Sequence, residues 1–159
     1  KELQEARILA ERRLEQLIAD QQTAIEDIVS RVNQKMAALN KTVTNGLENP
    51  PVLAISDAKE ITFGTAGNTS EGTACKSMIL FDLAVLELTG TPALVHDGNI
   101  LHSISRDHFD KLLELYRQSG KQIFIAADRA ENEILTQSTI LHLTEDKRLF
   151  GFSWGRKKA

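Results

Sequence analysis

The sequence predicts an α/β protein preceded by one long helix, and two observations lead to this prediction. The first 46 residues contain no proline, have glycine only at Gly46, and are rich in residues that favour helices. Two short apolar segments, 93–97 and 122–127, are separated by a helical segment, and each runs into an acidic residue. Such an arrangement is typical of a parallel α/β unit. We therefore expect an amphipathic helix over 1–46 and an α/β domain over 50–159.

The N-terminal helix has the apolar spacing of a coiled coil. The positions of this seam are Ile18, Ile25, Val32 and Leu39, with Leu14 and Ile28 on the partner series. Polar residues interrupt that partner series, and a long amphipathic helix packed on its own domain explains the pattern equally well. Both interpretations stay open. Asn45-Gly46 predicts the end of the helix, and Asn49-Pro50-Pro51 prevents its continuation.

From Val52 onward, turn signals divide the chain into short elements. A glycine- and hydroxyl-rich loop over 64–72 separates a pair of strands from a mostly apolar helix. Gly120 closes a second helix. The expected strands and helices, in chain order, are strands 52–55 and 60–63, helix 73–88, strand 93–97, helix 106–119, strand 122–127, and a terminal hairpin of 139–143 and 149–154.

The loop over 67–72 has the first six positions of a phosphate-binding Walker A motif, G-x-x-x-x-G. A Walker A motif continues at once with lysine, whereas Lys76-Ser77 arrive three residues late, almost a full helical turn. We therefore reject that motif. A loop that leads directly into a helix still suits an anion, because backbone N–H groups and the helix dipole point at it. A surface loop with an ordinary N-cap, Ser70 or Thr69, explains the same residues.

Composition narrows the classes of function. The chain has 159 residues and a net charge of −3, so it is not a basic nucleic-acid binder as a whole. It has no apolar stretch of membrane-spanning length and no secretory signal, which predicts a cytoplasmic protein without membrane contact. The lone Cys75 leaves no thiol cluster for a metal. The chain begins at Lys1 with its first methionine at Met36, which we interpret as a fragment or a processed product.

The order of glycine-rich loop, helix, apolar strand with Asp97, helix and apolar strand resembles the C-terminal half of a P-loop ATPase head of the SMC-like, ABC type. More narrowly, it resembles the uncharacterised domain that ends YydD-like bacterial proteins. In this resemblance Ser70-Glu71-Gly72 corresponds to the signature loop and Asp97 to the Walker B aspartate. The helix before Pro50 corresponds to the returning arm of a coiled coil.

The resemblance implies an ATP site that is split between chains. Asp97 would hold Mg²⁺, while Ser70 and Gly72 would contact ATP held by a second protomer. An N-terminal lobe of the same protein would supply Walker A, the heads or helices would form a homodimer, and the whole protein could bind nucleic acid. Relatives of this architecture serve DNA repair, chromosome organisation or defence against phage.

Two departures from the resembled family leave the catalytic residues unknown. Gly98 stands where a glutamate usually orients the attacking water, and the strand that ends at Asp128 lacks the switch histidine. A scaffold or dimerisation module without turnover is therefore the alternative, and a metal-dependent nuclease built on His96, His102 and His108 ranks last. We expect His96 to be a hydrogen-bonded strand histidine and Asp82 to be an exposed helix residue.

Overall fold

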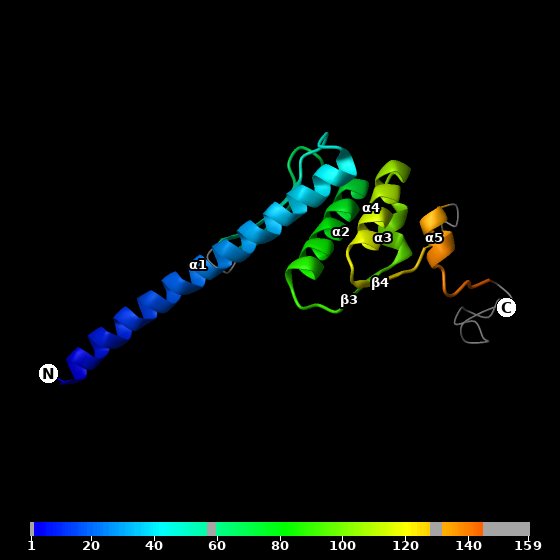
Figure 1. Ribbon diagram of the computed structural model, residues 1–159. Helices are drawn as coiled ribbons and strands as arrows, with labels where there is room; N and C mark the ends of the chain where they lie inside the picture. Colours follow the sequence, from blue (N-terminus) through cyan, green and yellow to red (C-terminus); the bar gives the residue numbers. More distant parts are fainter. Residues whose placement is uncertain (1, 57–59, 128–131, 145–159) are drawn as a thin grey trace, which may run out of the picture. The chain divides into compact units, whose positions relative to one another are not determined.

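The computed structural model of the chain describes residues 2–56, 60–127 and 132–144 (Figure 1). Contacts divide the chain into two compact units, residues 1–128 and 129–159. The first unit holds the long helix, both small sheets and all three residues predicted to bind nucleotide or metal. The chain is thus mixed α/β with a long N-terminal helix, as the sequence predicts.

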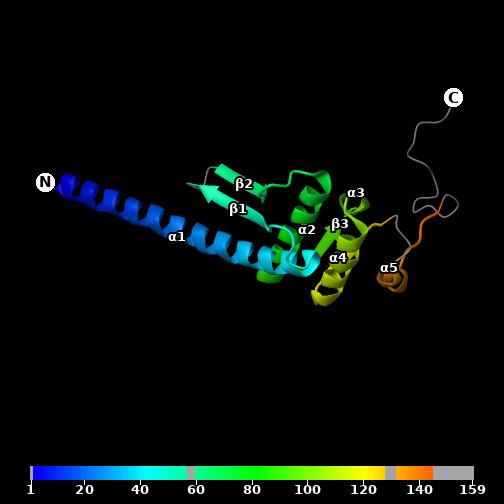
Figure 2. The same ribbon diagram turned by 90° about the horizontal axis from the view of Figure 1, so that it is seen from above.

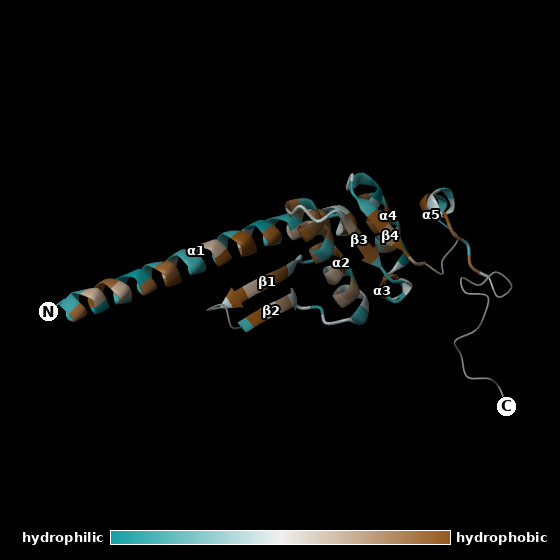
Figure 3. Cartoon of the chain, turned by 90° about the horizontal axis from the view of Figure 1, so that it is seen from below, coloured by the Kyte–Doolittle hydropathy of each residue, from teal (hydrophilic) through white to brown (hydrophobic). Residues whose placement is uncertain are grey.

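The first helix, α1 (Glu2–Thr44), divides into a free half and a packed half. It ends where predicted, because Asn45 and Gly46 adopt positive φ of 54° and 75°. From Val32 onward its apolar face is buried, whereas Ile18 and Ile28 are 57% and 55% exposed. Apolar residues nevertheless recur along the whole helix (Figure 3). The packed-helix interpretation therefore holds for the second half, and the coiled coil stays a prediction for the first.

An antiparallel hairpin follows α1. Strand β1 (Pro51–Ser56) pairs with β2 (Glu60–Thr65), which confirms the two predicted strands and extends both. In Figure 2 the hairpin lies alongside α1, with β1 next to the helix. On the side of α2 (Glu71–Leu88), Phe63 meets Phe81 edge to face with ring centroids 5.6 Å apart. The hairpin is thereby fixed to both helices.

The core of the first unit lies between three helices: α1, α2 and α4 (Arg106–Gln118). Their buried apolar side chains include Met36, Val43, Ile79, Leu80, Leu83, Leu112 and Leu113. In addition, Lys111 Nζ donates a hydrogen bond to Val43 O at 3.0 Å, which links α4 to the end of α1. This packing holds the N-terminal turns of α2 and α4 close to the segment that follows α1.

The predicted parallel unit is present. Strand β3 (Ala93–His96) pairs in parallel with β4 (Gln122–Ile125), and α4 lies between them in the chain. Both strands are shorter than expected. Asp97 does not extend β3 but starts a short helix that the sequence did not reveal, α3 (Gly98–His102). Asp128 lies outside the described residues.

In the second unit, the structure describes one short helix, α5 (Glu133–Ser138), where the sequence predicted none. Asn132 Oδ1 accepts hydrogen bonds from the N–H groups of Ile134 and Leu135, which caps this helix. The strand predicted over 139–143 is wrong, because these residues adopt no regular structure and have no strand partner within the described residues. Its expected partner at 149–154 lies outside the described residues.

Among the described helices, none combines the length and the apolar character that crossing a membrane requires.

Candidate functional site

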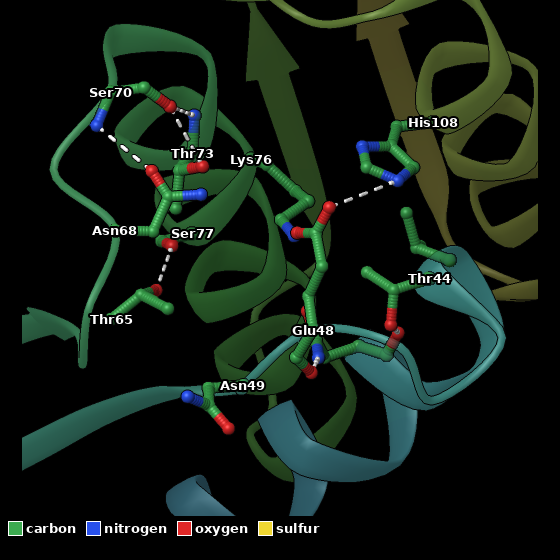
Figure 4. Close-up of polar contacts among 12 residues, drawn as sticks. Thr44, Glu48, Asn49, Thr65, Asn68, Ser70, Thr73, Lys76, Ser77 and His108 are labelled. Carbon is green, nitrogen blue, oxygen red and sulfur yellow. Dashed lines mark hydrogen bonds and ion pairs between the residues drawn. The ribbon is translucent and has the colours of Figure 1, made fainter.

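The loop before α2 is held in place by its own side chains (Figure 4). Ser70 N–H donates a hydrogen bond to Asn68 Oδ1 at 3.1 Å, and Thr73 N–H donates to Ser70 Oγ at 3.4 Å. Ser70 Oγ also donates to Thr73 Oγ1 at 3.0 Å. Ser70 is therefore the N-cap of α2, which confirms the capping interpretation. Because Ser70 stays exposed, the cap does not remove it from a ligand's reach.

Gly72, in the first turn of α2, lies against the end of α3. A Cβ at this position would lie 2.6 Å from Ser103 O, so no side chain fits without a backbone shift. On the same side, Ser103 Oγ donates a hydrogen bond to Glu71 Oε1 at 3.0 Å. The loop and the α3–α4 junction are thus in close contact, which the sequence did not reveal.

A polar cavity of about 460 Å³ opens beside this loop. Ser70, Gly72 and Thr73 line one side of it, and Ser105 and His108, at the start of α4, line another. The N-terminal ends of two helices therefore meet at one polar cavity. The hydroxyls of Ser70, Thr73 and Ser105 and the backbone N–H groups of a helix N-terminus suit hydrogen bonding to an anion.

A buried lysine, Lys76, which the spacing had excluded from a Walker A motif, also lines this cavity. Lys76 is 1% exposed, and its ammonium is ion-paired with Glu48, which follows the end of α1. His108 Nε2 lies 3.6 Å from the other carboxylate oxygen of Glu48 (Figure 4). The spacing that excluded Lys76 from a Walker A motif places it six residues after the N-cap Ser70, in the second turn of α2. Glu48 carried no signal in the sequence, since it follows a helix end in a loop.

The electrostatics of this cluster are set by Glu48. The hydrogen bond from Lys76 lowers the pKa of the Glu48 carboxyl below its usual value, although partial burial opposes the shift. Burial lowers the pKa of His108, and the Glu48 carboxylate opposes that shift. At neutral pH the cluster therefore has an ionised Glu48 beside a neutral His108. The lysine charge is neutralised within the protein, so an anion in the cavity would depend mainly on hydroxyl and backbone donors.

Asp97 lies apart from this cavity. It caps α3, since Oδ1 accepts from Gly98 N–H at 2.7 Å and Oδ2 accepts from Asn99 Nδ2 at 3.1 Å. It lines a second cavity of about 450 Å³, beside Ala126 and Ala127 at the carboxyl end of β4. The structure thus brings Ser70 and Gly72 together and places Asp97 in a different cavity. A role of Asp97 in metal binding stays a prediction.

Gly98, the residue after Asp97, has no room for a side chain. A Cβ at this position would lie 2.9 Å from Ala126 O, because the start of α3 presses against the end of β4. The sequence showed only that glutamate is missing here. The structure adds the physical reason, since any larger residue would have to push the two segments apart.

A buried polar network holds the end of β3. His96 is 2% exposed, its Nδ1 lies 2.6 Å from Tyr116 Oη, and its Nε2 lies 3.0 Å from Asp82 Oδ2. His96 is thus the hydrogen-bonded strand histidine that the sequence predicted. The expectation that Asp82 is an exposed helix residue is wrong, because Asp82 is half-buried beside His96. Burial raises the pKa of Tyr116, and the nearby Asp82 carboxylate adds to this shift.

The histidines do not form a metal centre in the described part of the chain. No three His, Cys, Asp or Glu side chains gather there in a metal-binding arrangement. His96 contacts Asp82 and Tyr116, whereas His108 contacts Glu48. The described residues therefore give the nuclease interpretation no support.

By fold, this is an α/β protein with a long N-terminal helix and, among the residues that the structure describes, two small two-stranded sheets. Residues 28–154 match the family described as "Uncharacterised protein conserved in bacteria (DUF2326)", and the chain belongs to this family. No curated protein matches the chain. The family is bacterial and its description assigns no activity, so function has to be argued from the site.

Proposed function

We propose that this chain is the C-terminal lobe of an SMC-like ATPase and supplies two separate half-sites for ATP. Asp97 holds the Mg²⁺ of ATP bound to an N-terminal lobe of the same protein. Ser70 and Gly72 contact the terminal phosphate of ATP held by a second protomer. One observation carries the proposal: Ser70 and Gly72 line one cavity, whereas Asp97 lines another. A split mechanism needs this separation, whereas a site built within one chain would need the three residues together.

The parallel pair β3–β4 supports a missing second lobe. Val95 and Phe124 are register partners, so their side chains share a face of the pair, and they are 73% and 44% exposed. Parallel strands occur almost only in sheets that are covered on both faces. In this proposal the N-terminal lobe packs over this face and buries Val95 and Phe124. Its strands also extend the sheet at an edge.

The surroundings of Asp97 fit a magnesium ligand. Each carboxylate oxygen accepts one hydrogen bond from the chain and keeps a further lone pair. Mg²⁺ is usually held by one or two carboxylates together with phosphate oxygens and water, so a single aspartate from this lobe is sufficient. When bound, Mg²⁺ neutralises charge on the phosphates during transfer. The contribution of this chain is to fix the Asp97 carboxylate through the α3 cap.

The test is ATP hydrolysis by the full-length protein and by two variants. Asp97→Asn keeps an oxygen that can cap α3 but removes the charge that binds Mg²⁺. Ser70→Arg fills the loop without touching Asp97. We expect both to lose turnover, whereas Asp20→Asn and Ser30→Arg, on the exposed half of α1, should match the wild type. If the wild type hydrolyses ATP and Asp97→Asn hydrolyses it equally fast, the proposal is wrong.

Gly98 favours the second candidate, a scaffold or dimerisation module without turnover. Its backbone leaves no space for the glutamate that would orient the attacking water, because Ala126 O is too close. A scaffold would still bind nucleotide or a partner but would release no phosphate. ATP binding by the full-length protein without phosphate release would favour this candidate over the ATPase.

A further inference from the structure

The hairpin β1–β2 has one closed edge and one open edge. On the closed edge, Asn33 of α1 donates from Nδ2 to Leu53 O and accepts from Leu53 N–H, both at 2.8 Å. These bonds satisfy the two backbone groups that Leu53 turns away from β2. Asn33 thus takes the place of a strand beside β1. Figure 2 shows β2 on the side of β1 that faces away from α1.

The contacts of Leu53 determine which backbone groups of β2 point outward. Leu53 is the register partner of Phe63. Opposite residues of an antiparallel pair either exchange both hydrogen bonds or both point away, so the N–H and C=O of Phe63 point away from β1. The alternation of the ladder gives the same orientation to Ile61. Among the described strands only β1 adjoins β2, so these four groups form an open hydrogen-bonding edge.

The side chains of β2 do not protect this edge. Ile61 and Phe63 are 69% and 40% exposed, and Glu60 is the only charged residue of the strand. Natural proteins usually protect edges with lysine, proline, a bulge or a covering element. A two-stranded sheet is also marginal by itself, and further strands stabilise it. The edge therefore has the chemistry to accept an antiparallel strand with apolar side chains.

We infer that β2 pairs antiparallel with β2 of a second copy of this chain, with Thr62 opposite Thr62 on the two-fold axis. Such an edge-to-edge pair is isologous, so one edge serves both copies. This register places Ile61 opposite Phe63 twice, and both residues offer their outward N–H and C=O groups. It places Glu60 opposite Gly64, so that no like charges meet. The product is a four-stranded sheet in the order β1, β2, β2, β1.

The neighbouring registers fit less well. Outward-facing residues alternate along the strand, and each must pair with an outward-facing residue of the other copy. The nearest alternative registers therefore move the two-fold axis by one residue, to Phe63 or to Ile61. With Phe63 on the axis, Ile61 would face Thr65, whose C=O already accepts a hydrogen bond from Asn68 N–H at 3.4 Å. With Ile61 on the axis, Phe63 would face residue 59, which precedes the start of β2 at Glu60. The Thr62 register alone uses both open residues fully.

Disulfide cross-linking of the full-length protein without nucleotide tests the pairing. In a background without native cysteines, Cys75 included, Thr62→Cys places two thiols opposite each other. Non-hydrogen-bonded partners have Cα atoms about 4.5 Å apart, within disulfide range. Ala54→Cys is the matched control, because Ala54 is the partner of Thr62 on β1 and lies three strand spacings, about 14 Å, from its own copy.

We expect Thr62→Cys to give on the order of tenfold more disulfide-linked dimer than Ala54→Cys under mild oxidation, since only the first lies within bonding distance. Adding Ile61→Pro should abolish the cross-link, because it removes an outward N–H without touching the β1–β2 ladder. Circular dichroism verifies that the variant is folded. Equal cross-linking of the two cysteine variants would overturn the inference. So would a cysteine at position 62 that stays monomeric, as expected if another segment of the protein covers the edge.

Discussion

Lys76 on α2 is ion-paired with Glu48, the residue that connects the end of α1 to the cavity beneath Ser70. The backbone of Glu48 is held too, because Asn40 Nδ2 donates to Glu48 O at 2.9 Å. This pair links the segment after the long helix to α2, and His108 at the start of α4 contacts the same carboxylate.

Glu48→Gln should lower the free energy of unfolding by about 3 kcal/mol, because it leaves the Lys76 ammonium buried without a counter-charge. Lys76→Met should cost less, because Glu48 is one-third exposed and stays hydrated. Urea unfolding measures both. The matched control is Glu87→Gln, which breaks the more exposed ion pair with Lys35 and should cost no more than about 1 kcal/mol. Equal losses for Glu48→Gln and Glu87→Gln would contradict this assignment.

Stability should decrease as the pH falls below about 6.5, the ordinary pKa of histidine, and His108 is the cause. Burial lowers its pKa in the folded state, so the unfolded chain binds the proton more readily, and protonation favours unfolding. His108→Gln should reduce this pH dependence. Glu48, whose pKa is also lowered, should add a second loss as the pH falls below 4.5. The measurement is a series of unfolding curves between pH 8 and pH 4, a range of about four pH units that includes the ordinary pKa values of both side chains. A wild type and a His108→Gln variant with the same slope near pH 6 would disprove the role of His108.

Gly98→Ala should destabilise the chain by about 1–3 kcal/mol, the usual cost of forcing extra atoms into a packed position. The added Cβ would lie 2.9 Å from Ala126 O. Gly90→Ala is the control, because no atom lies within 4 Å of a Cβ there. Thermal unfolding of the two variants provides the comparison. If Gly98→Ala proves as stable as Gly90→Ala, the backbone can move apart, and the steric argument against a glutamate at this position fails.

The two halves of α1 should respond differently to truncation of their apolar side chains. Leu39→Ala should cost about 2–4 kcal/mol of unfolding free energy, because Leu39 is buried in the core of the first unit. Ile18→Ala should leave the stability of this chain almost unchanged, since Ile18 is exposed, but should weaken any association of α1 with a partner helix. Urea unfolding and sedimentation separate these effects. A large stability loss from Ile18→Ala in the monomer would mean that the free half of α1 is packed.

Sequence patterns predicted most of the fold because they depend on local physics. Asn45-Gly46 ended α1 through positive φ, and two apolar segments formed the parallel pair β3–β4. The failures came from tertiary contacts. The pairing of Asp82 with His96 joins residues fourteen positions apart, and α3 depends on the Asp97 cap. The segment 139–143 was expected as one strand of a terminal hairpin, but a strand also needs a neighbour, which no pattern within the segment supplies.

The candidate site was partly predictable for the same reason. Ser70 and Gly72 were selected by the resemblance of Ser70-Glu71-Gly72 to a signature loop, and the local pattern of a loop that enters a helix predicted Ser70 as an N-cap. The pairing of Lys76 with Glu48 across 28 residues has no signature in the sequence. Neither does the contact of Gly72 with Ser103, which arises where α2 meets the end of α3.

The central claim is that the two half-sites of one chain serve different ATP molecules, and mixing two inactive variants tests it most directly. Full-length Ser70→Arg and Asp97→Asn should each lack ATPase activity alone. When they exchange subunits, the mixed dimer combines an intact Asp97 with an intact Ser70 from its partner. We predict recovery of roughly a quarter of wild-type turnover, because half of the dimers are mixed and each mixed dimer has one complete site. A mixture that stays inactive while the wild type hydrolyses ATP would contradict the account.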